Sequence, residues 1–84
     1  MTNTAVAVAI PLAQPRVRRG RLARAGASLW RVLAPDGRVA GHLRALESDA
    51  GMRYRAERLR GGALVAIGEF WTADEAVETL LLSR

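Results

Sequence analysis

The 84-residue chain contains no cysteine and has a single histidine, His42. Without cysteine it cannot form a disulfide, a thiolate nucleophile or a cysteine metal site, and this absence fits a reducing cytoplasm. One histidine cannot supply a multi-histidine metal site, and no serine or cysteine is placed for it to activate as a nucleophile. We therefore expect no metal, no cofactor and no enzymatic activity, and the sequence points to no small-molecule substrate.

Lysine is also absent, so all 13 basic residues are arginines. Together with the frequent alanine, glycine and valine, this is typical of a GC-rich genome, and basicity alone is weak evidence for a nucleic-acid partner. The placement of the charges is more informative. Residues 1–35 carry six arginines and no acid, whereas residues 36–84 carry seven arginines and eight acids. The net charge of +5 therefore comes from the N-terminal part of the chain.

Long hydrophobic runs are missing as well. The apolar segment at residues 5–10 ends at Pro11 and is too short for a membrane span, which needs about 20 apolar residues. Positive charge follows this segment, whereas a secretory signal places positive charge before its apolar run. We therefore expect neither secretion nor a membrane partner.

The densest positive charge lies at residues 16–24, where five of nine residues are arginine. We expect residues 1–27 to form a basic, disordered N-terminal arm. One interpretation is a solvated tail that aids solubility. The other is an arm that follows DNA phosphates or the minor groove. The arginines available for that role are Arg16, Arg18, Arg19, Arg21 and Arg24.

Residues 28–84 show the pattern of one small domain. Strand-like segments at 29–33, 38–46, 52–59 and 63–70 are separated by turns such as Asp36-Gly37 and Gly61-Gly62. Thr72 and Glu75 then match a capping box, and an apolar stripe with helical spacing follows them. The sequence predicts an α+β fold, with an antiparallel β-meander of three to four strands and one C-terminal helix packed on one face.

Side-chain alternation separates the two faces of this sheet. The face toward the helix is expected to hold the apolar residues Trp30, Val32, Val39, Gly41, Leu43, Ala45, Met52, Tyr54 and Ala56. The opposite face is expected to carry Arg31, Arg38, His42, Arg44, Arg53 and Arg55. These arginines have two interpretations: a surface that binds nucleic acid, or the ordinary solvent face of a one-sided sheet.

A strand that begins with Trp30, a turn at Asp36-Gly37 and a helix start at residues 70–76 resemble the arm-type DNA-binding domains of tyrosine integrases and the related AP2-like domains. The resemblance implies that the exposed sheet face enters the DNA major groove. It would assign base contacts to Arg31, Arg44, Arg53 and Arg55. Two features depart from that pattern: the additional strand at 63–70 and the nearly neutral charge of the folded part. A double-stranded RNA-binding domain is disfavoured, because its last helix needs a basic start and this one is acidic.

A protein partner is the second hypothesis. The apolar residues Leu59, Val65, Ile67 and Trp71 are expected to form an exposed patch at an edge strand, which favours a partner protein or a homodimer. The chain is thus expected to be a small DNA-binding or regulatory protein, or alternatively a protein interaction module. Salt separates the two, because it weakens phosphate contacts strongly and apolar contacts little.

Overall fold

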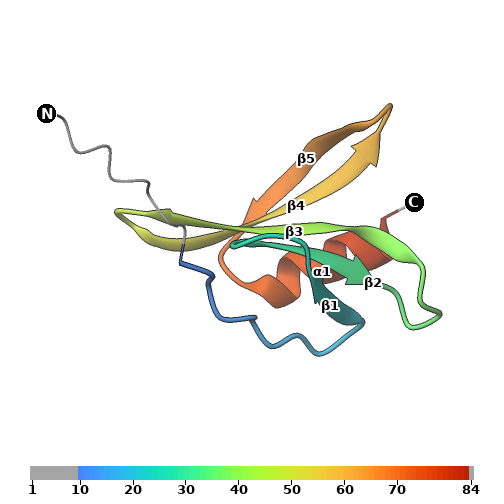
Figure 1. Cartoon of the computed structure of the whole chain (residues 1–84), viewed down its shortest axis with the longest axis horizontal. Helices are drawn as coiled ribbons and strands as arrows, with labels where there is room; N and C mark the ends of the chain where they lie inside the picture. Colours follow the sequence, from blue (N-terminus) through green and yellow to red (C-terminus); the bar gives the residue numbers. More distant parts are fainter. Residues whose placement is uncertain (1–9, 84) are drawn as a thin grey trace, which may run out of the picture.

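A computed structural model describes residues 10–83 of the chain. These residues form a single antiparallel sheet whose five strands follow one another in chain order, with one helix packed on β3, β4 and β5 (Figure 1). The α+β class and the meander with a C-terminal helix confirm the sequence prediction. The elements are β1 (Arg21–Arg24), β2 (Leu29–Leu33), β3 (Val39–Ser48), β4 (Gly51–Arg60), β5 (Ala63–Phe70) and α1 (Ala73–Leu82).

Strand β1 corrects the prediction in two ways: the sheet has five strands, and residues 21–24 belong to it and are not part of a disordered arm. The strand pairs with β2 and places Leu22 opposite Val32. Upstream, Leu12 and Val17 are also half-buried against the core. The backbone N–H of Leu12 donates to the carbonyl of Ala27 at 2.8 Å. The rest of the predicted arm, residues 1–9, lies outside the described residues.

The turns between the strands follow local chemistry. Gly61 and Gly62 have φ values of +56° and +81°, so the two-residue loop between β4 and β5 needs the left-handed conformation that glycine adopts without strain. Between β2 and β3, the side chain of Asp36 accepts hydrogen bonds from the backbone N–H of Arg38 at 3.1 Å and from its Nε at 2.8 Å. These bonds lower the pKa of Asp36. Arg38 therefore belongs to this turn, not to the sheet face predicted for it.

Helix α1 begins where the capping box predicted. The Thr72 hydroxyl accepts from the backbone N–H of Glu75 at 3.2 Å and donates to the Glu75 carboxylate at 2.9 Å. Asp74 and Glu75 lie in the first turn, where negative charge complements the helix dipole. The buried side of the helix is the predicted apolar stripe, formed by Ala73, Ala76, Val77 and Leu80.

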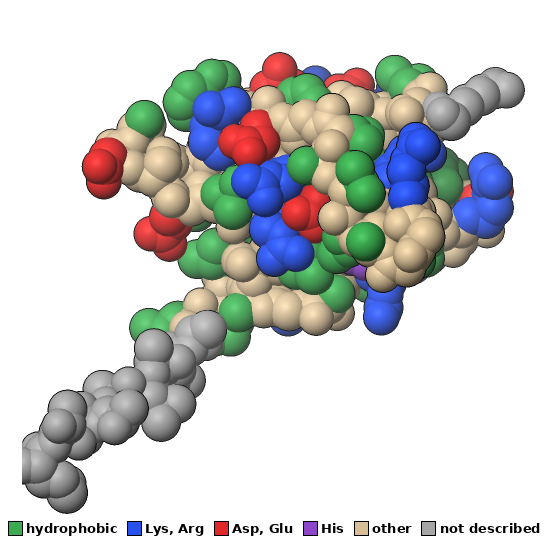
Figure 2. All heavy atoms as spheres, turned by 90° about the horizontal axis from the view of Figure 1, so that it is seen from above, with side chains coloured by type: hydrophobic (Ala, Val, Ile, Leu, Met, Phe, Trp, Pro, Cys, Tyr) green, Lys and Arg blue, Asp and Glu red, His purple; other side chains and the backbone are tan. Residues whose placement is uncertain are grey.

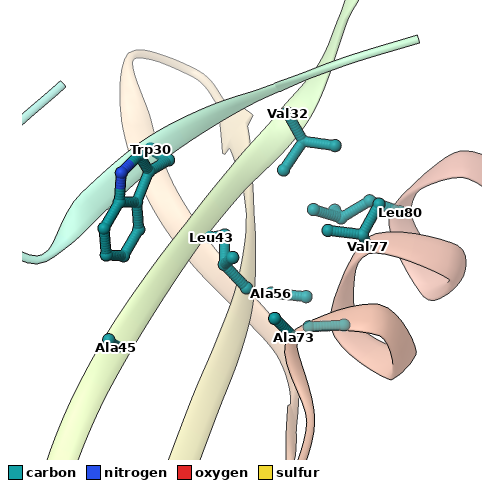
Figure 3. Packing of buried hydrophobic residues seen from close by; sticks show 9 residues of the cluster. Trp30, Val32, Leu43, Ala45, Ala56, Ala73, Val77 and Leu80 are labelled. Atoms are coloured by element: carbon teal, nitrogen blue, oxygen red, sulfur yellow. The ribbon is translucent and has the colours of Figure 1, made fainter. Parts of the chain in front are cut away.

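The core lies between α1 and the centre of the sheet (Figure 3). Trp30, Val32, Leu43 and Ala56 have no exposed surface. Gly41 also lies in this core, where no side chain fits. An added Cβ would come within 2.6 Å of both the Glu57 carbonyl oxygen and a Leu80 methyl carbon. The close approach of helix and sheet therefore depends on a residue without a side chain.

Val39 is a second correction, because it was predicted in the core and is 54% exposed. The pairing of β2 with β3 shifts between Val32 and Leu33, so that Val32 lies opposite Gly41 but Leu33 lies opposite Val39. This irregularity turns Val39 away from the helix, while Ala40 packs against the core instead.

Within residues 10–83, no helix has the length and apolar character that crossing a membrane requires.

Candidate nucleic-acid interface

The face of the sheet opposite α1, here called the open face, carries rows of polar side chains. Across β2, β3 and β4, Arg31 lies opposite His42, and His42 lies opposite Glu57. In the next row, Arg44 lies opposite Arg55, and Arg55 lies opposite Glu69. Basic and acidic groups alternate on this side of the molecule (Figure 2). The predicted arginine face is thus present, but the sequence prediction did not pair its arginines with Glu57 and Glu69.

Glu57 is the centre of the open face and is only 4% exposed. Ala56 and Glu57 are consecutive and both buried, and strand alternation places Ala56 in the core and Glu57 on the open face. Arg44 holds the carboxylate as a fork, with Nε 2.9 Å from Oε2 and Nη2 3.2 Å from Oε1. Such bidentate pairs are the stronger kind of charge-assisted hydrogen bond. Arg44 is therefore engaged inside the protein.

Arg55 is also engaged. Its Nη2 and Nε lie 2.9 Å and 3.1 Å from Oε2 of Glu69, and its Nη1 lies 3.9 Å from Glu57. Arg55 contacts both acids. The open face therefore carries one chain of alternating charges, formed by Arg44, Glu57, Arg55 and Glu69. A base edge or phosphate would have to displace a carboxylate to reach either guanidinium.

Arg53 occupies a different environment at the end of the open face. Its guanidinium carbon lies 4.1 Å from the ring centroid of Trp71, a cation–π distance. The indole is 58% exposed, so it presents surface to solvent beside a positive charge. The sequence prediction placed Trp71 in an apolar patch at an edge strand. It did not include the contact with Arg53, because the two residues are distant in the sequence.

His42 lies between charged neighbours on the open face. Burial lowers the pKa of His42 most, the positive charges of Arg31 and Arg44 lower it further, and Glu57 opposes the shift. Its Nδ1 is buried without a hydrogen-bond partner among the described residues. Near neutral pH the imidazole is therefore uncharged and adds nothing to the positive field of this face.

The N-terminal arginines divide into two groups. Arg24 folds back on the protein: its guanidinium donates to the carbonyls of Gly26, Ala27 and Leu12, and it lies 5.1 Å from the ring of Trp30. Arg24 thereby covers the buried indole. The other predicted arm residues, Arg16, Arg18, Arg19 and Arg21, are exposed.

These exposed arginines are nearly free of acidic neighbours. Arg18 approaches Asp74, but the separation from Nε to Oδ2 is 3.8 Å and the Arg18 side chain is 91% exposed. Within residues 10–83, the side chains of Arg16, Arg19, Arg21 and Arg31 form no ion pair. Since a pair this exposed contributes little, Arg18 also remains available.

Strands β1 and β2 bring two of these charges, Arg21 and Arg31, onto one edge of the sheet. Arg21 is paired with Leu33 and Ala23 is paired with Arg31, so the two arginines lie diagonally across neighbouring strands on the open face. Arg16 and Arg21 also border a shallow hollow of about 520 Å³. Arg16, Arg18 and Arg19 lie in the segment that leads into β1. We call these three residues, together with Arg21 and Arg31, the β1 arginine cluster.

The predicted protein-interface residues do not form one patch. Leu59 is 64% exposed and lies opposite Leu64 on the open face, whereas Val65 lies opposite Arg58 on the other face. Ile67 is half-buried against the core. Trp71 follows the far end of β5, beside Arg53. The four side chains are therefore dispersed along and across the β4–β5 hairpin.

In the described part of the chain, no three His, Asp or Glu side chains gather in a way that would hold a metal ion. Comparison with protein-family models, with curated proteins and with solved structures finds no match for this chain.

Proposed function

We propose that the protein is a small, non-enzymatic DNA-binding protein that contacts the phosphate backbone through the β1 arginine cluster. The observation that carries this proposal is the set of four exposed guanidiniums, Arg16, Arg19, Arg21 and Arg31, that have no carboxylate partner within residues 10–83. They lie in a part of the chain where residues 1–35 contain no acid. Positive charges without carboxylate partners attract a polyanion.

Phosphate contacts of this kind have a defined energetic signature. Each phosphate that a guanidinium neutralises releases condensed counterions, and log K falls with log salt by about 0.9 per contact on duplex DNA. The five residues of the β1 arginine cluster therefore give an expected slope of roughly −4 to −5. Binding should be tight at low salt and weak at high salt.

The open face contributes less than the sequence predicted. If Arg44 left Glu57 to contact a base, a carboxylate that is 4% exposed would lose its fork of hydrogen bonds. An unpaired buried charge is costly, so this exchange is disfavoured. Of the four arginines that the resemblance to arm-type and AP2-like domains assigns to bases, Arg31 and Arg53 remain without a carboxylate partner among the described residues. We infer affinity for DNA with little base preference.

The test is a fluorescence-anisotropy titration of labelled duplex DNA at several salt concentrations. The cluster variant is Arg16→Gln with Arg19→Gln. The matched control is Arg38→Gln with Arg60→Gln, which removes the same charge from two exposed positions outside the cluster. We expect the cluster variant to lose more than tenfold in affinity and its salt slope to become shallower by about 2, whereas the control changes little.

Two outcomes contradict the proposal. If the full chain does not bind duplex DNA even at low salt, DNA binding is wrong. If both double variants lose affinity equally, net charge and not the cluster governs binding.

Intrinsic fluorescence shows how far the DNA extends over the open face. Trp30 has no exposed surface and Trp71 is 58% exposed, so quenching by bound DNA reports mainly on Trp71. Quenching that Arg53→Gln weakens would place DNA against the Arg53–Trp71 pair. Binding without quenching would confine the contact to the β1 edge.

A further inference from the structure

Trp71 is the one exposed aromatic residue in the described part of the chain. Its side chain is 58% exposed, whereas Tyr54 and Phe70 are half-buried and Trp30 has no exposed surface. The backbone on either side of Trp71 is fixed, because Phe70 is paired with Tyr54 in the sheet and Thr72 caps α1. The exposed ring is therefore anchored at the junction of β5 and α1.

Arg53 adds a positive charge to this ring. Its guanidinium carbon lies 4.1 Å from the indole centroid, and its Nε is buried with no hydrogen-bond partner among the described residues. No carboxylate among those residues pairs with Arg53, and Glu69 of β5 is bound by Arg55 at 2.9 Å. Since Nε is buried and the indole is exposed, the indole is the outer member of the pair. The pair thus offers solvent a flat ring with an unneutralised cation stacked against it.

We propose that Trp71 stacks on an unpaired base of single-stranded DNA and that Arg53 attracts the adjoining phosphate. This inference rests on the DNA binding proposed above and specifies the form of the DNA. An unpaired base can offer its face to a side chain, whereas a base inside a duplex must first leave the stack. Stacking on an aromatic ring accepts every base. A stacking contact therefore agrees with the weak base preference inferred above.

The open face can guide one strand from the β1 arginine cluster to the indole. Arg31, the member of the cluster on β2, shares a row with Glu57 of β4, and Arg53 lies four residues from Glu57 along β4. The spacing of strands and residues in a sheet places the Cα atoms of Arg31 and Arg53 roughly 16 Å apart. A few nucleotides span this distance. Glu57 does not confront the strand, because it is buried and bound by Arg44.

The test compares a labelled oligothymidine with a labelled duplex of equal length by fluorescence anisotropy at low salt. Phosphate contacts alone favour the duplex, because each contact there releases more counterions, with salt slopes of about 0.9 per contact against about 0.7 on a single strand. A preference for the single strand therefore requires a further contact. We expect the unaltered chain to bind the oligothymidine more tightly than the duplex.

Variants of Trp71 assign that contact. Trp71→Leu should lose about tenfold in affinity for the single strand and little for the duplex, and Trp71→Phe, which keeps an aromatic ring, should retain most of the affinity. The matched control is Leu59→Ala, which shortens another exposed apolar side chain of the open face, 64% exposed, and should change neither affinity. Circular dichroism should show the same fold for every variant, because both side chains are exposed.

Two results overturn the inference. One is an oligothymidine that binds the unaltered chain no more tightly than the duplex does. The other is a Trp71→Leu variant that loses affinity for both forms equally, or for neither. If the duplex still binds with the expected salt slope in these cases, only the stacking contact is wrong. If neither form binds at low salt, the proposed function fails as well.

Discussion

At the scale of single residues, Glu57 has two opposing effects. Its carboxylate is 4% exposed and forms a fork with Arg44, whose side chain is 33% exposed. The same carboxylate cancels positive charge on the open face. Stability and the proposed affinity for DNA therefore make opposite demands on this position.

The variant Glu57→Gln separates these effects. It should lower the free energy of unfolding by about 1–3 kcal/mol, because Arg44 loses a charged hydrogen-bond partner in a partly buried setting. It should also raise DNA affinity several-fold, since the open face gains one positive charge. Urea unfolding and anisotropy titration measure the two quantities. Glu47→Gln is the control, because it makes the same charge change at an exposed position of β3 with no ion pair among residues 10–83.

Equal effects of the two glutamine variants on DNA affinity would show that total charge matters and that the buried network does not. An unchanged stability of Glu57→Gln would mean that the fork to Arg44 contributes nothing measurable.

His42 gives a pH dependence with a definite sign. Burial and the nearby Arg31 and Arg44 lower its pKa in the folded protein below the ordinary value of about 6.5. Between the folded pKa and about 6.5, the unfolded chain binds more protons than the folded chain, so the free energy of unfolding falls as the pH decreases through that interval. Above about 6.5, the contribution of His42 to stability is fully present. Urea unfolding at pH 7.5 and pH 5 should show a larger loss for the unaltered chain than for His42→Gln. Equal losses would exclude His42 as the cause.

At the scale of elements, α1 tests whether local chemistry sets a boundary. Replacing Thr72 with alanine removes the hydroxyl that accepts from the Glu75 N–H at 3.2 Å, and should lower stability by about 1 kcal/mol. Thr72→Ser keeps that hydroxyl and should retain most of the stability. Thermal unfolding followed by circular dichroism measures both. A serine variant as unstable as the alanine variant would show that the methyl group, not the cap, matters.

Elements whose signals are local were predictable from the sequence. The capping box at Thr72 and Glu75 and the glycine turn at residues 61–62 use neighbouring residues only, and both are found where they were expected. Strand β1 was not predictable in this way. Residues 21–24 offer one apolar side chain, Leu22, that contacts the core, and their order depends on pairing with β2.

The site shows the same limit. Alternation along the strands predicted which face Arg44 and Arg55 would occupy, because the period of two is a local property. It did not predict their carboxylate partners. Those pairs depend on the register of β3 with β4 and of β4 with β5. Arg24 is similar, since only the folded chain places its guanidinium over Trp30.

At the scale of the whole molecule, the structure joins the N-terminal segment to the domain that the sequence placed at 28–84. Leu12, Val17 and Leu22 are half-buried against the core, and Arg24 lies over Trp30. The backbone N–H of Arg18 also donates to Asp74 of α1 at 2.9 Å. The segment that carries the arginines proposed to bind DNA is therefore also part of the packing.

A chain that begins at Ser28 loses all of these contacts. We expect its free energy of unfolding to fall by about 3 kcal/mol, from roughly 1 kcal/mol for each of three half-buried apolar side chains. We also expect Trp30 to become accessible. In a Trp71→Phe background, where Trp30 is the remaining tryptophan, emission should shift to longer wavelength and acrylamide should quench it. A chain that begins at Ile10 is the control, because it keeps all of these contacts. If the Ser28 chain instead keeps full stability and a protected Trp30, residues 28–84 fold alone and β1 serves only to position arginines.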